Sequence, residues 1–203
     1  MGRAVGPVVA SRLGRSLLEL GGNNAMIVAP SADLDLATRA ILFSAVGTAG
    51  QRCTSLRRLI VHKDVCDELV TRLKKAYGTI RVGAPLDAGT LVGPLVDKGA
   101  FDAMQAALTQ AQAQGGTVTG GNRVLEDQWP NAHYVQPAIV EMPDQSGIVL
   151  DETFAPILYV MSYGDLSEAV ALHNAASQGL ASCIFTNDLR EAEQFMGPAG
   201  SDC

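Results

Sequence analysis

A cysteine and a glutamate that precedes it are the residues best suited to covalent chemistry in this sequence. Cys53 closely follows Gly50, and Glu19 lies 34 positions before the cysteine. A thiolate attacks carbonyl carbons readily, and a carboxylate can act as the base that activates water. The two groups can act together only if the intervening chain returns to the same cleft. We therefore interpret Cys53 and Glu19 as the nucleophile and the general base of thioester chemistry.

Both residues also have simpler interpretations. Cysteine is among the most frequently buried residue types, so Cys53 could be a small core residue. Glu19 could be an exposed carboxylate at a strand end. A redox sensor would need a resolving cysteine near Cys53, and none stands at short spacing in the sequence. Because C-x-x-C spacing is absent, we expect neither a disulfide framework nor a metal site.

The elements around these residues alternate between strands and helices. Gly47 to Gly50 should unwind a helix and place Cys53 on a loop, where a catalytic thiol must be reachable. Short apolar runs predict buried strands at 15–20, 25–29, 58–62, 117–119, 134–140, 157–161 and 182–186. Helical spacing and capping residues predict helices at 4–13, 32–46, 64–77, 98–114, 165–178 and 188–196. This alternation predicts an α/β fold with an open, mainly parallel sheet and helices on both faces.

Composition limits the classes of partner. The chain has 203 residues, 47% apolar, and a formal net charge of −6. That apolar content is enough for a core of its own. We expect no nucleic-acid partner, because the basic residues are scattered and form no stripe. We also expect no membrane partner and a cytoplasmic location, because no apolar run reaches the length of a span and no secretory segment begins the chain.

Four short motifs in order resemble those of the aldehyde dehydrogenase superfamily. They are Glu19-Leu20-Gly21-Gly22-Asn23-Asn24, Gly50-Gln51-Arg52-Cys53, Gly93-Pro94 and Asp151-Glu152-Thr153-Phe154-Ala155-Pro156. The amino-acid sequence around these motifs is most similar to that of the antiquitin-like branch, which oxidises α-aminoadipate semialdehyde. The resemblance implies that 1–20 is a remnant of the cofactor-binding domain ending in the strand of the general base. It implies that 21–203 is a truncated catalytic domain, and that the full-length enzyme is a homo-oligomer.

The resemblance also implies a reaction and a role for each motif residue. An aldehyde would be oxidised to the acid through a cysteine thiohemiacetal and thioester, with NAD as cofactor and NADP as the alternative. The implied catalytic residues are Cys53 and Glu19. The implied substrate-binding residues are Arg52 and Thr54, and the implied cofactor-binding residues are Glu152, Phe154, Leu20 and Gly21. In this branch the arginine holds a distant substrate carboxylate, for which its planar fork is suited.

Several features support a different interpretation. Arg52 could simply cover surface, Glu152 could be a turn carboxylate, and Phe154 could be a core aromatic. Ala100 stands where many relatives have a polar residue, and no G-x-G-x-x-G loop follows a strand. The strands that bind adenosine in the family would then be missing. The alternative function is a catalytically inert truncated homologue that acts only as a binding or assembly piece.

Overall fold

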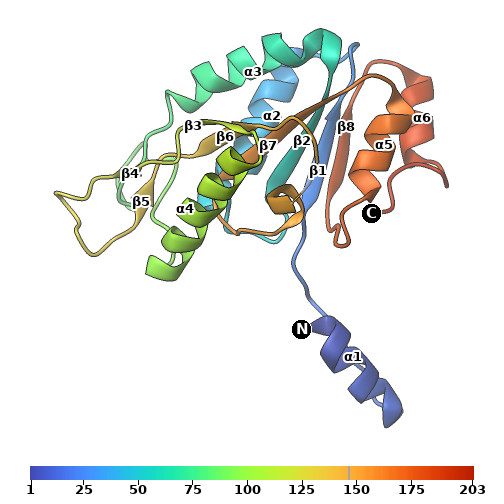
Figure 1. Ribbon diagram of the computed structural model, residues 1–203, viewed down its shortest axis with the longest axis horizontal. Coiled ribbons are helices and arrows are strands. Elements are labelled where there is room, and N and C mark those ends of the chain that lie inside the picture. The colour runs from blue at the N-terminus through green and yellow to red at the C-terminus, as the bar shows by residue number, and fades with distance from the viewer. Residues whose placement is uncertain (146) are drawn as a thin grey trace.

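A twisted sheet forms the centre of the molecule. The structure is a computed structural model that describes residues 1–145 and 147–203. Within these residues the main sheet has the strand order β3-β6-β7-β2-β1-β8 (Figure 1). All neighbouring strands run parallel except β3, which pairs antiparallel with β6. The strands are β1 (Asn24–Val28), β2 (Leu56–His62), β3 (Thr117–Thr119), β6 (Ala138–Glu141), β7 (Ile157–Tyr163) and β8 (Ser182–Phe185).

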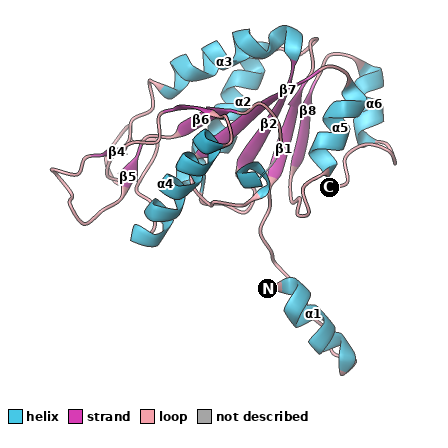
Figure 2. Ribbon diagram, viewed as in Figure 1, coloured by secondary structure: helices cyan, strands magenta, loops and turns pink. Residues whose placement is uncertain are grey.

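Helices cover both faces of this sheet, as predicted. Figure 2 shows α2 and α3 on one side and α4 and α5 on the other, with α6 beside α5. The helices are α1 (Gly2–Ser11), α2 (Leu34–Val46), α3 (Lys63–Tyr77), α4 (Lys98–Ala113), α5 (Leu166–Asn174) and α6 (Leu189–Met196). The described helices include none that is both long enough and apolar enough to cross a bilayer. The predicted open α/β architecture is confirmed.

The central strands are apolar because they are covered twice. Every residue of β1 is buried, and β2 is buried up to its last residue. Parallel strands with helices on both faces have no solvent side, so they read as continuous apolar runs. Asn24 on β1 and two arginines on β2, Arg57 and Arg58, are exceptions, and all three are buried. Burying a guanidinium is costly unless its donors are satisfied, so Arg57 and Arg58 need hydrogen-bond partners within the protein.

Local sequence features account for most boundaries and for several corrections. Pro137 divides the predicted strand 134–140 into β5 (Tyr134–Val135), which pairs with β4 (Arg123–Val124), and β6. The cap of α2 is Asp33, whose carboxylate accepts the N–H groups of Asp35 and Leu36. Ser31, just before this cap, bonds to Thr186 across the chain. A 3₁₀ turn, η2 (Gly147–Leu150), precedes the segment that holds Glu152.

The N-terminal segment lies apart from the rest of the fold (Figure 1). The prediction of a buried strand at 15–20 is wrong, because these residues are exposed and irregular. Leu17 is 83% exposed. A strand needs a hydrogen-bonding neighbour, and among the described residues no strand runs beside this segment. Its nearest packing partner is α1, where a Cβ on Gly2 would lie 2.7 Å from Leu20 Cδ1.

Candidate active site

A left-handed turn presents Cys53 to solvent. The 3₁₀ segment η1 (Gly47–Gly50) follows α2, and Thr48, Ala49 and Gly50 have φ angles of 55°, 53° and 65°. Non-glycine residues seldom adopt this region, and such strain is concentrated at functional sites. Cys53 is exposed on the loop that follows. The expectation of a reachable thiol on a loop is confirmed.

The side chain of Asn24 holds this loop in place. Its Nδ2 donates to the carbonyl oxygens of Cys53 at 2.8 Å and Ser55 at 2.9 Å. Its Oδ1 accepts the N–H groups of Leu180 at 3.1 Å and Ala181 at 2.8 Å. Asn24 is 3% exposed, so these bonds form away from competing water. One buried amide thus joins the cysteine loop to the chain that enters β8.

Gly50 should not tolerate a side chain. Its φ is +65°, and a Cβ there would lie 2.5 Å from the carbonyl carbon of Ala155. We expect Gly50→Ala to lower the free energy of unfolding by about 2–4 kcal/mol, because backbone strain and overpacking add. Urea unfolding measures this change. Gly78→Ala is the control: its φ is −65° and the nearest atom would be 3.5 Å away, so a loss comparable to that of Gly50→Ala would contradict the steric explanation.

Glu19 lies on the extended segment before β1 and is exposed. Together with Leu20, Gly21 and Glu152 it lines a cleft of about 550 Å³. Cys53 is not among the lining residues, but its carbonyl oxygen would lie 2.7 Å from a Cβ placed on Gly22. The backbone at 20–22 therefore connects the cysteine loop to the cleft that holds Glu19. A direct meeting of the two side chains stays a prediction.

Glu152 is packed against the glycine pair. A Cβ on Gly21 would lie 1.9 Å from Glu152 Oε2, so a side chain at this position would displace the Glu152 carboxylate. The N–H of Gly22 donates to Glu152 Oε1 at 3.2 Å. Phe154 is two residues further on, with φ +57° and 40% of its surface exposed. The structure thus brings Leu20, Gly21 and Glu152 together at the cleft. Phe154 is partly exposed and is not a core aromatic.

Arg52 and Thr54 flank Cys53 in sequence, and neither residue lines the cleft that holds Glu19. The Arg52 guanidinium lies 5.4 Å from the centroid of the Phe43 ring, and Nη2 donates to the Phe43 carbonyl at 3.4 Å. Among the described residues Arg52 Nε has no hydrogen-bond partner. Thr54 is exposed and lines a separate hollow of about 120 Å³. A substrate role for either residue stays a prediction.

Two buried residues that the sequence interpretation missed contact the cysteine loop and support it. Asn24 and Arg57 are buried on β1 and β2, and both contact the cysteine loop. The available signal was a polar or charged residue at the start of an otherwise apolar strand. Such a residue is retained in a core only when its hydrogen bonds are satisfied.

Three potential metal ligands lie close together elsewhere. The donor atoms of His173, Asp202 and Cys203 are within 4.8 Å of one another. Burial and the nearby charge of Arg58 lower the pKa of His173, while Asp202 opposes this shift. Burial lowers the pKa of Arg58 to about 10, and Asp202 partly opposes this shift. The guanidinium already supplies the positive charge here, so we assign no metal to this cluster.

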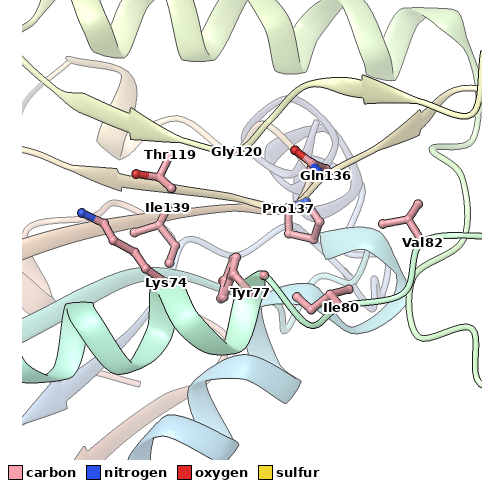
Figure 3. A pocket seen from close by; sticks show the side chains of 10 residues that line it. Lys74, Tyr77, Ile80, Val82, Thr119, Gly120, Gln136, Pro137 and Ile139 are labelled. Atoms are coloured by element: carbon pink, nitrogen blue, oxygen red, sulfur yellow. The ribbon is translucent and has the colours of Figure 1, made fainter.

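A further cavity of about 200 Å³ lies between the end of α3 and the β3–β6 edge. Figure 3 shows Tyr77, Ile80 and Pro137 around it, with Lys74 and Thr119 at one side. Lys74 is paired with Glu141. None of the predicted site residues lines this cavity.

The open α/β fold matches that of solved aldehyde dehydrogenases. A sequence profile of the aldehyde dehydrogenase family matches residues 1–199, and the chain belongs to this family. It is 49% identical over its whole length to alpha-aminoadipic semialdehyde dehydrogenase from Bos taurus, of which it covers 37%. It is 45% identical to aldehyde dehydrogenase family 7 member A1 from Pisum sativum, again over its whole length, and covers 39% of that protein.

A solved structure shows the same relation. Betaine aldehyde dehydrogenase from Staphylococcus aureus, determined in complex with NAD+, superposes with a TM-score of 0.89 at 28% identity. The match covers 95% of this chain and 39% of that one. The chain therefore spans less than half the length of the relatives it matches.

Proposed function

We propose that this chain carries the nucleophile and base of an NAD-dependent aldehyde dehydrogenase acting on a semialdehyde such as α-aminoadipate semialdehyde. The observation that carries the proposal is that Cys53 is exposed on the loop after the left-handed turn at 48–50, where Asn24 Nδ2 donates to its carbonyl oxygen. Family membership and the similarity to the bovine semialdehyde dehydrogenase support the reaction class. NADP as an alternative cofactor, a cytoplasmic location and a homo-oligomer belong to the same proposal.

The residues present suit the proposed chemistry. The Cys53 thiolate attacks the aldehyde carbon, and its own backbone N–H is a donor for the alkoxide that forms. Glu152, held against Gly21, offers a carboxylate for ribose hydroxyls, and the exposed Phe154 ring offers a flat face for nicotinamide. NAD, when bound, supplies the hydride acceptor. Glu19 takes a proton from water, which then hydrolyses the thioester at Cys53.

Arg52 is the proposed specificity residue. Arg52 directly precedes Cys53 in sequence, and its guanidinium packs over the Phe43 ring with Nη2 donating to the Phe43 carbonyl. A charged hydrogen bond from a guanidinium to a carboxylate contributes about 1.5–3 kcal/mol. The protein should therefore prefer an aldehyde with a distant carboxylate over one of the same length without it.

NADH formation tests the proposed function. Purified protein with NAD+ should produce NADH from α-aminoadipate semialdehyde, with kcat/KM about tenfold or more above that for hexanal. The NADH absorbance is followed over time. If neither aldehyde gives NADH and p-nitrophenyl acetate leaves Cys53 unmodified, the proposal fails and an inert binding or assembly piece is favoured.

A further inference from the structure

Arg57 is a buried cation that contacts the cysteine loop. It lies on β2, and its side chain is 4% exposed. Burial lowers the pKa of Arg57, whereas Glu152 raises it, with a smaller contribution from Cys53. A guanidinium in this position loses its hydration and must recover hydrogen bonds from the protein.

The partners of Arg57 belong to three separate segments. Nε donates to the carbonyl oxygen of Gly22 at 3.3 Å. Nη2 donates to the carbonyl oxygens of Gly50 at 3.3 Å and Arg52 at 3.2 Å. The same Nη2 lies 3.5 Å from Glu152 Oε1. These partners lie on the segment after Glu19, on the cysteine loop, and on the segment that holds Glu152 and Phe154.

The segment that holds Glu152 and Phe154 contacts both Arg57 and the backbone of Gly22. The Arg57 guanidinium lies 5.4 Å from the Phe154 ring centroid, within cation–π range. Glu152 Oε1 also accepts the N–H of Gly22, the residue whose carbonyl accepts from Arg57. Removing the guanidinium would leave the carbonyls at 22, 50 and 52 and a half-buried carboxylate without this donor. Each segment could then move independently.

We propose that Arg57 is a positioning residue that fixes the cysteine loop relative to the Gly21–Gly22 backbone and the Glu152–Phe154 segment. The inference rests on the proposed function, because it assigns the purpose of the alignment to the reaction at Cys53. It adds a route by which Glu152, a predicted cofactor contact, controls the nucleophile without touching it. The route runs from Glu152 through Arg57 to the carbonyls of Gly50 and Arg52.

Acylation of Cys53 by p-nitrophenyl acetate isolates this effect. The thiolate attacks the ester carbonyl, the acetyl group forms a thioester with sulfur, and p-nitrophenolate leaves with the electron pair. No cofactor takes part. Since a displacement of about 1 Å costs about 10²-fold in rate, Arg57→Met should lower the maximal acylation rate by roughly that factor. The half-saturating ester concentration and the burst amplitude should change little, whereas general unfolding would lower the burst amplitude.

Arg58→Met is the matched control. Arg58 is equally buried on β2, but it donates to Asn23, Gln145, Leu172 and His173. This variant should lose stability while its folded fraction keeps most of the acylation rate. An equal loss of rate in both variants would show that Arg57 acts only through general stability, and would overturn the proposal.

Glu152→Ala keeps the test decisive if Arg57→Met does not fold. This variant should slow acylation in the native background, although the ester reaction needs no cofactor, and should add little in the Arg57→Met background. If native protein is acylated and the variants that fold, Glu152→Ala alone or together with Arg57→Met, react at the native rate, the role of Arg57 is refuted while the proposed function stands. If native Cys53 is not acylated at all, the proposed function fails with it.

Discussion

Cys53→Ser should abolish turnover of p-nitrophenyl acetate, with a loss of about 10³-fold or more. Removing a nucleophile eliminates the covalent route and leaves only the weak catalysis of the surrounding donors. The serine hydroxyl is nearly isosteric, so the left-handed turn at 48–50 should persist. Steady-state release of p-nitrophenolate measures the loss.

The other cysteines provide the control for this prediction. Burial raises the pKa of Cys66 and of Cys183, so both thiols are poorly ionised near neutral pH. Cys66→Ser should retain the native rate. If Cys66→Ser removes the activity and Cys53→Ser does not, the nucleophile has been misassigned.

Glu19→Gln should separate formation of the thioester from its hydrolysis. The amide cannot accept a proton from water, so steady-state turnover should fall by about 10²–10⁴-fold. The initial burst of p-nitrophenolate should remain, because Cys53 attacks the ester without help from Glu19. Stopped-flow absorbance resolves the burst from the slow phase.

An exposed glutamate on α6 serves as the comparison for Glu19. Glu193 lies outside the cleft that Glu19 lines. Glu193→Gln should keep both the burst and the steady-state rate. Loss of the burst in Glu19→Gln would contradict the assignment, since it would place Glu19 in the acylation step.

The periodic elements of the sheet could be predicted from sequence because their patterns are local. Apolar runs located β1, β2 and β7, and the glycines at 47 and 50 indicated the loop that exposes Cys53. The same reasoning failed at 15–20, where an apolar run lacks a neighbouring strand. A periodic pattern shows that a segment can be buried, but not what covers it.

The supporting contacts could not be predicted because they depend on register. Asn24 reaches the carbonyl of Cys53 only because β1 and β2 run parallel with Asn24 opposite Leu56. Arg57 reaches Glu152 across 95 positions of sequence. The placement of Glu152 and Phe154 rested on the family resemblance, and the structure adds their common partner, Arg57.

Peptide mass spectrometry of the acetylated protein is the most direct test of the paired roles of Cys53 and Glu19. Native protein and the Glu19→Gln variant are mixed with p-nitrophenyl acetate, quenched at successive times and digested. We expect acetyl on the peptide containing Cys53 in both, transient in native protein and persistent in the variant. Acetyl on another residue, or equal lifetimes on Cys53 in the two proteins, would contradict the account.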